Sequence, residues 1–229
     1  ANTLQQVRQT QTYLASNDTS GNNKNTLIVS QNVMDYSGRT SLSIMPVPTD
    51  GRIQSYKDNF IKSEKTGEIY RAINFDVGEG TGLNYNSPDK IKDTKGEAMY
   101  YYSGDDTLNP DIPDAEVYTF SRVLYDNDGS NRAIEQSGIG KTHALRDDGN
   151  PKHTTKMTYS NPSDEELLRV FGEEALPADK VIKTETTDPN GVTSVVYTTQ
   201  EGTTIATALR YRKHDNLLDL DNEPFKGFD

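Results

Sequence analysis

Short polar turns that end in glycine divide this chain into brief runs of β-branched and aromatic residues. Such turns are DYSGR (35–39), DNDGSN (126–131), DPNG (188–191) and TQEG (199–202). Glycine supplies the positive φ that a tight turn needs, and aspartate can accept hydrogen bonds from its own backbone. Runs of β-branched residues separated in this way are typical of strands that pair as hairpins. We therefore expect a mostly β protein of antiparallel hairpins and a meander.

The first half of the chain contains four strand candidates. Two lie at 27–33 and 42–47 on either side of the first turn, and Pro46 and Pro48 are expected to end the second. Residues 68–77 and 97–103 also resemble strands. The stretches between them, up to residue 113, are long and turn-forming, which is uncommon in compact domains and predicts surface decoration or strands that pair elsewhere.

The second half has more regular strand signals. After the turn at 126–131, the sequence SGIGK (137–141) predicts a tight β corner at Gly138 and Gly140. The glycines of the last two turns, Gly191 and Gly202, stand where a hairpin requires them. The strands predicted here are 117–125, 132–136, 152–159, 180–187, 192–199 and 203–209.

One short helix is expected at residues 163–171. Ser163 can be its N-cap and Glu166 the third helical residue, which together form a capping box. Gly172 can end the helix. An apolar stripe on one side predicts that this helix covers a sheet face; it consists of Leu167, Leu168 and Phe171.

Composition divides the chain into three ranges. Residues 1–25 are rich in Asn, Gln, Thr and Ser and predict an extended polar arm. Residues 26–110 form a β-rich region with long loops, and residues 111–229 form the meander region with the short helix. Leu, Ile, Val and Phe make up only about a fifth of the 229 residues, so contacts outside the chain are expected to hold it, from further polypeptide or from a partner protein.

Charge and residue usage exclude several function classes. The net charge of −11, without a cluster of Lys and Arg, argues against nucleic-acid binding. No stretch of 18 apolar residues is present, so no membrane span is expected. The absence of cysteine excludes disulfides and thiolate metal sites. The first residues lack the apolar core of a signal peptide, so either the chain is cytosolic or a targeting region lies outside these residues.

The turns share a motif once they are aligned. Each resembles the Tyr-Asp repeat YDxxGR of the Rhs family, although the third and fourth turns lack the arginine. The residues that carry the motif are Asp35, Gly38 and Arg39; Tyr125, Asp126, Gly129 and Arg132; Asp188 and Gly191; and Gly202.

The order of segments strengthens this resemblance. The strand and NR turn, the QSGIGK loop, the TYSNPSDEELLRVFG helix and the DPNG…EGTTIATAL meander follow one another as in very large Rhs-type proteins of Bacteroidota, ahead of or opening the repeats. The match covers about residues 111–209, and residues 27–48 match more loosely. The chain departs from the family pattern at Arg210 and Tyr211, where Ala-Gly is expected.

The resemblance implies a scaffolding role. Rhs repeats wind into a large β-shell around a payload, and in Bacteroidota such chains resemble cargo of the type IX secretion system. It therefore implies a non-catalytic segment that builds or caps a β-sheet shell, located outside the cell or at its surface. Its partners would be other segments of the same large chain or a partner protein, with a secretion carrier as another candidate.

Histidines and aspartates of two loops are candidates for metal binding. His143 and His153 flank a loop with Asp147 and Asp148, but their spacing sets no metal geometry. Asp126 and Asp128 leave calcium open as an alternative, as does the acidic run at 219–223, although Gly129 breaks the EF-hand spacing.

Other motifs favour plain structural interpretations. SGIGK has one residue between its glycines, where a phosphate loop needs four. The acidic pairs Asp164–Glu165 and Glu173–Glu174 suit the start of a helix better than acid–base catalysis. The tyrosines at 100–102 can contribute to a sugar platform. We therefore expect no catalytic residue, cofactor or metal. The alternatives are a glycan-binding or enzymatic module of a surface complex, or a secretion substrate bound to its carrier.

Overall fold

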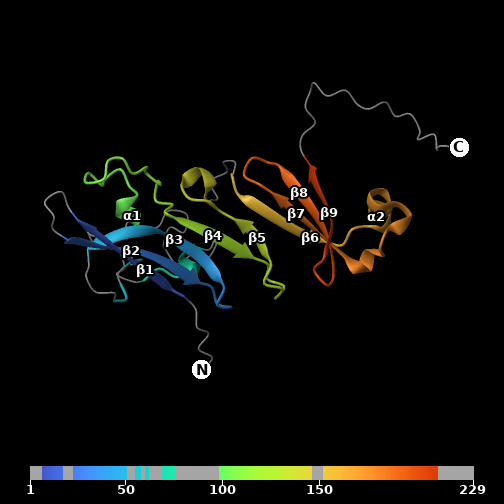
Figure 1. Cartoon of the computed structure of the whole chain (residues 1–229), viewed down its shortest axis with the longest axis horizontal. Coiled ribbons are helices and arrows are strands. Elements are labelled where there is room, and N and C mark those ends of the chain that lie inside the picture. The colour runs from blue at the N-terminus through green and yellow to red at the C-terminus, as the bar shows by residue number, and fades with distance from the viewer. Residues whose placement is uncertain are drawn as a thin grey trace, which may run out of the picture. The chain divides into compact units, whose positions relative to one another are not determined.

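The protein is an open antiparallel β-meander with one short helix (Figure 1). The computed structural model describes residues 7–17, 23–50, 55–57, 60–61, 69–75, 98–145 and 152–210. Within them the order of the strands in the sheet follows the sequence, and the sheet does not close. The strands are β1 Gln9–Asn17, β2 Asn23–Met34, β3 Thr40–Asp50, β4 Phe120–Tyr125, β5 Ala133–Gln136, β6 Thr155–Ser160, β7 Val181–Thr187, β8 Thr193–Thr199 and β9 Thr204–Arg210.

The helices are few and short. The main one is α2, Asp164–Phe171, and α1, Ala98–Tyr101, is a single turn. The predicted fold class, mostly β with antiparallel hairpins and one short helix, is confirmed. The 3₁₀ helices of the described residues are Ala72–Phe75, Lys141–His143, Gly172–Glu174 and Ala178–Lys180.

The chain forms two compact units, Ala1–Thr158 and Tyr159–Asp229. This division follows contacts in space, whereas the ranges 1–25, 26–110 and 111–229 follow composition. The predicted polar arm contains β1, which pairs with β2 from Gln9 opposite Gln31 to Asn17 opposite Asn23.

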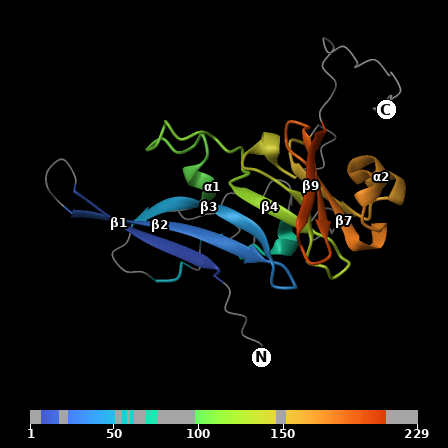
Figure 2. The ribbon, with the colours of Figure 1, turned by 45° about the vertical axis from the view of Figure 1, so that its right-hand side comes forward.

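In the first unit β1, β2, β3 and β4 lie side by side (Figure 2). Burial alternates strictly along β2, where Leu27, Val29, Gln31 and Val33 are buried and their neighbours are half-buried. Side chains alternate between the two faces of a strand, so one face of the sheet is the core face. β3 contributes the buried Leu42, Ile44 and Val47 to the same core.

Short segments cover this core face, and two of them correct the sequence prediction. Residues 72–75 of the predicted strand 68–77 are a 3₁₀ helix, and residues 98–101 of the predicted strand 97–103 are α1. The consecutive residues Ala98 and Met99 are both buried. A strand would send them to opposite faces, whereas one helical turn brings both onto the sheet.

The prolines of β3 do not end it, so that prediction was wrong. β3 continues to Asp50, through Pro46 and Pro48. Met45 and Pro46 together lie opposite Ser30, because the register shifts between Val29 and Gln31. Proline is tolerated at such a bulge, where a ladder hydrogen bond is missing anyway.

The strand predicted at 117–125 begins later, at Phe120. Glu116 and Val117 have φ values of 48° and 69°. Left-handed backbone cannot extend into a β ladder, and it is uncommon for a β-branched residue. The two residues form a turn that leads into β4.

In the second unit, α2 packs against one face of the β7–β8–β9 hairpins. Leu167 of α2 is fully buried and clusters with Val181, Val195 and Tyr197. Phe171 meets Tyr197 edge to face, with ring centroids 6.1 Å apart. The helix therefore covers a sheet face, as its apolar stripe predicted.

Candidate functional site

Three of the predicted turns share one geometry, at residues 35–39, 188–192 and 199–203. In each, the N–H of the first residue donates to the carbonyl of the fifth, and the glycine N–H donates to the carbonyl of the first, at 2.8–3.0 Å. The first side chain then accepts a hydrogen bond from the N–H of the fifth residue. That distance is 2.9 Å for Asp35 and Asp188 and 3.3 Å for Thr199.

Glycine is required at the fourth position of these turns. Gly38, Gly191 and Gly202 have φ values of 77°, 84° and 87°. This left-handed conformation costs other residues about 1–2 kcal/mol. One local solution therefore closes all three hairpins, and Thr199 can replace aspartate because its hydroxyl is also an acceptor.

The turn that follows Tyr125 is a longer version. Its closing bond runs from Asp126 N–H to Arg132 O at 2.8 Å, two residues further than in the other turns. Gly129 and Asn131 have φ values of 79° and 58°. Asp128 accepts a hydrogen bond from Ser130 N–H at 2.7 Å, so its carboxylate serves the turn.

The first two turns contact each other through Arg39. Its guanidinium lies 4.4 Å from the centroid of the Tyr125 ring, and its Nε donates to Asp35 at 2.7 Å. A further hydrogen bond of 3.4 Å reaches Asn131. The Tyr125 hydroxyl donates to Thr40 O at 3.0 Å. The arginine of one motif thus packs on the tyrosine of the next.

The two glycines of the predicted corner are required for different reasons. A Cβ on Gly138 would lie 2.9 Å from the Cβ of His143, so the close approach requires glycine. Gly140 has a φ of 81° and donates to Tyr118 O at 2.9 Å. Both positions belong to a tight loop that ends in the 3₁₀ helix Lys141–His143.

The helix cap joins a charged network. Ser163 Oγ accepts a hydrogen bond from Glu166 N–H at 3.1 Å. The Glu166 carboxylate binds Lys183 Nζ at 2.7 Å and the Tyr197 hydroxyl at 2.6 Å. Lys183 also meets Glu185 at 3.0 Å, and Glu185 meets Arg210 at 3.0 Å. Glu166 therefore links α2 to β7 and β8.

This network shifts the titration of its members. Hydrogen bonding to Lys183 lowers the pKa of Glu166 and of Glu185. Hydrogen bonding to Glu166 raises the pKa of Lys183. Burial raises the pKa of Tyr197. The shifts of Glu166, Glu185 and Lys183 favour their charged forms, and the shift of Tyr197 favours its neutral hydroxyl. The network is therefore an ion-pair cluster, with a tyrosine hydroxyl as a further donor, that holds the helix.

A hollow of about 480 Å³ opens at the end of β2. Its wall includes the amide side chains of Gln31 and Asn32 and the buried Tyr70. Two exposed tyrosines also line it, Tyr36 with 94% of its surface exposed and Tyr56 with 58%. Arg8 and Arg71 also line it, and within the described residues neither guanidinium has a hydrogen-bond or ion-pair partner.

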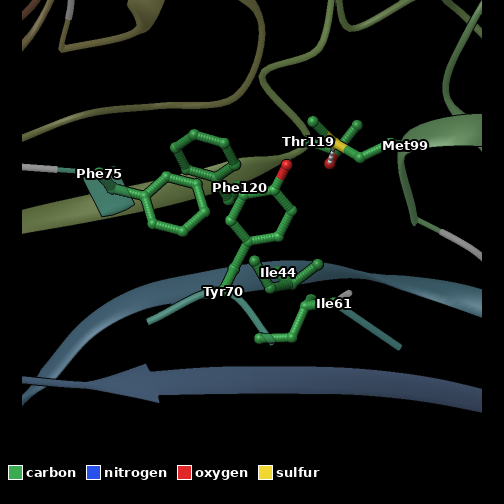
Figure 3. Close-up of a pocket in the computed structure, with 7 residues that line it drawn as sticks. All are labelled: Ile44, Ile61, Tyr70, Phe75, Met99, Thr119 and Phe120. Carbon is green, nitrogen blue, oxygen red and sulfur yellow. Dashed lines mark hydrogen bonds between the residues drawn. The ribbon is translucent and has the colours of Figure 1, made fainter. Parts of the chain in front are cut away.

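A second space lies inside the core of the first unit and is too small for a ligand. Its volume is about 10 Å³, which is room for about one water. The lining residues point toward one another, and Thr119 donates to the Met99 sulfur at 2.7 Å (Figure 3). They are Ile44, Ile61, Tyr70, Phe75, Met99, Thr119 and Phe120.

The candidate metal residues are not gathered into a site among the described residues. No group of three or more His, Cys, Asp or Glu side chains there is placed to hold an ion. His143 Nδ1 lies 3.0 Å from the carbonyl oxygen of His153. Asp147, Asp148 and the run 219–223 lie outside the described residues.

The remaining candidates make structural contacts. Tyr101 and Tyr102 pack edge to face against each other beside the core, and the Tyr102 hydroxyl donates to Pro46 O at 2.5 Å. Asp164 accepts a hydrogen bond from Ala178 N–H at 3.1 Å. Glu165 pairs loosely with Arg169 at 3.8 Å.

Sequence reasoning missed Lys183, Tyr197 and the hollow. Lys183 and Tyr197 could have been paired from the sequence, because the turn at 188–192 sets a register that places Lys183 opposite Tyr197. The hollow has no such signal, since its residues come from separate segments that tertiary packing alone brings together.

Together, the fold and these contacts define an open β-meander in which three hairpins share one turn type. In the part of the chain that is described, no helix is long and apolar enough to cross a membrane. Comparison with protein-family models, with curated proteins and with solved structures found no match.

Proposed function

We propose that the chain is a non-catalytic structural segment of a large Rhs-like protein, located outside the cell or at its surface. Its hairpins would extend an antiparallel sheet and build or cap a β-shell. Partners would be other segments of the same polypeptide or a partner protein.

The recurring turn is the observation that carries this proposal. Residues 35–39, 188–192 and 199–203 close their hairpins with the same hydrogen bonds. A meander that uses the same turn in three of its hairpins can be extended by adding further hairpins of that kind. The contact of Arg39 with Tyr125 adds support, because it joins successive motifs through the residues that resemble the YDxxGR repeat.

The edges of the sheet support the same function. β1 and β9 end the strand order of the described residues, so each presents one row of backbone groups without a strand partner there. Unpaired edges are templates for further strands. Both carry exposed apolar side chains, Leu14 with 46% and Leu209 with 78% of their surface exposed.

The test is the size and location of the native polypeptide that carries these residues. An antibody against the chain, followed by mass spectrometry of the captured protein, should find a mass well above 25.5 kDa. Protease added to intact cells should remove the signal, while a cytoplasmic marker survives. A native mass of 25.5 kDa, or protection from protease until the cells are lysed, would contradict the proposal.

A further inference from the structure

We propose that the hollow at the end of β2 binds an acidic saccharide, a sugar that carries a carboxylate or sulfate group. This is a binding function beyond the structural role, and it rests on different residues. The hollow combines aromatic rings, amide side chains and arginines in one concave surface of about 480 Å³. Ligand pockets typically measure about 300–1,000 Å³.

The tyrosines provide apolar surface for a sugar ring. Tyr36 and Tyr56 are 94% and 58% exposed, so a ligand in the hollow can reach their rings. A tyrosine offers a flat face to C–H groups and a hydroxyl for hydrogen bonds. Asn32, which is half-buried, adds an amide group that can bond to sugar hydroxyls, whereas the buried Gln31 already accepts a hydrogen bond from Gln9 at 3.0 Å.

The arginines select a negative ligand. Asp35 also lines the hollow, but its carboxylate is bound by Arg39 at 2.7 Å. Arg8 and Arg71 keep unpaired guanidinium groups within the described residues, in a chain of net charge −11. A guanidinium binds carboxylate or sulfate through two parallel hydrogen bonds. Two such groups lining one hollow therefore favour an anionic sugar over a neutral one.

The hollow is held in shape by side-chain hydrogen bonds. Gln9 of β1 accepts from Lys57 N–H at 2.9 Å and donates to Lys57 O at 3.1 Å. Gln11 donates to Ser55 O at 2.7 Å. These bonds fasten residues 55–57 to the sheet and so position Tyr56. A wall fixed before binding loses little entropy when the ligand enters.

Titration calorimetry of the whole chain with trigalacturonic acid, a sulfated disaccharide and neutral maltotriose tests this inference. We expect at least one acidic sugar to bind and maltotriose to bind at least tenfold more weakly. Arg71→Ala and Arg8→Ala should each weaken acidic-sugar binding about tenfold. Arg169→Ala, which removes an exposed arginine of α2, should leave it unchanged. Inorganic sulfate at matched ionic strength should compete poorly.

Several results would overturn the inference. The first is that neither acidic sugar binds, and the second is that maltotriose binds as tightly as the acidic sugars. The third is that Arg169→Ala weakens binding as much as Arg71→Ala and Arg8→Ala do, which would indicate unspecific attraction. If inorganic sulfate competes at the same concentration as the sugar, the hollow binds anions in general and does not recognise the sugar. Thermal unfolding of each variant, followed by circular dichroism, keeps loss of binding separate from loss of fold. Tyr56→Ala supplies a second test that leaves the charges intact.

Discussion

At the scale of single residues, the first side chain and the glycine of each turn have separate tasks. Asp188 Oδ1 accepts hydrogen bonds from the N–H groups of Asn190 and Val192, both at 2.9 Å. These donors point into the turn and cannot reach the strand ladder. Gly191 reverses the chain with a φ of 84°. Removing either residue should therefore weaken the hairpin in a different way.

Gly191→Ala tests the conformational requirement. The added Cβ meets no atom within 4 Å, so any cost comes from the positive φ alone. We expect a loss of about 1 kcal/mol in the free energy of unfolding. Urea unfolding followed by circular dichroism measures it. Asn190→Ala is the control in the same turn and should change stability little; an equal loss in both variants would contradict the assignment to φ.

Arg39 and Tyr125 are predicted to be coupled. Arg39→Ala should lower the free energy of unfolding by about 1–2 kcal/mol, because it removes a half-buried ion pair and the contact with the ring. A double-mutant cycle with Tyr125→Leu should give a coupling of about 0.5–1 kcal/mol. Tyr125→Phe, which keeps the ring, should retain the contact with Arg39. A coupling of zero would mean that the two motifs are joined only by their strands.

At the scale of elements, α2 depends on more than its cap. Its eight residues are too few for a stable isolated helix, so packing must support it. Leu167 supplies the apolar contact, while Glu166 connects the first turn of the helix to Lys183 and Tyr197. The helix and the β7–β8 hairpin are therefore expected to lose structure together.

The pH dependence of unfolding tests the network. Glu166 and Glu185 have lowered pKa values, so their stabilisation is complete above about pH 4.3 and is lost as pH falls through the lower folded pKa values. Lys183 has a raised pKa, so its contribution is complete below about pH 10.4 and is lost as pH rises through the higher folded value.

Lys183→Met should remove about 2 kcal/mol at pH 7 and flatten the loss of stability below about pH 4.3. Urea unfolding at a series of pH values provides the measurement. Lys180→Met removes an exposed lysine that lies 3.9 Å from Asp179 and should leave the profile unchanged. If the stability of Lys183→Met still falls steeply in acid, carboxylates outside this network are responsible for the loss.

At the scale of the whole molecule, the open sheet edges are the main feature. Natural proteins protect their edge strands with charges, bulges or covering segments. β9 instead carries Leu209, which is 78% exposed, beside two alanines and two threonines. Such an edge is expected to be covered when the structural role that we propose is fulfilled.

Leu209→Lys is expected to affect the stability of the isolated chain and of the native polypeptide differently. In the isolated chain the substitution should leave stability within about 0.5 kcal/mol, since the side chain is already in water. In the native polypeptide it should lower stability or yield, because a charge would be buried against the next strand. Leu108→Lys, at an 84% exposed position, is the matched control and should be silent in both. If Leu209→Lys also leaves the stability and yield of the native polypeptide unchanged, β9 remains an uncovered edge strand there.

The turns and hairpins were predictable from sequence because their signals are local. Aspartate, glycine and the β-branched runs between them determine φ and register over a few residues. The cap of α2 at Ser163 is local in the same sense. The strands predicted at 68–77 and 97–103 failed because burial against the sheet, rather than local propensity, selects a helical turn there. Pro46 does not end β3 because a bulge accommodates its missing N–H, while Pro48 lies opposite Ile28 within the strand.

The sequence by itself therefore determined the class of fold, the hairpin turns and the helix start, each of which depends on residues close in the chain. Only the tertiary structure decided that Arg39 lies over Tyr125, that Lys183 anchors α2, and that Arg8, Tyr56 and Arg71 share one hollow. The physical reason is separation along the chain. These contacts join residues many positions apart, and their positions follow from how the sheet and its covering segments pack.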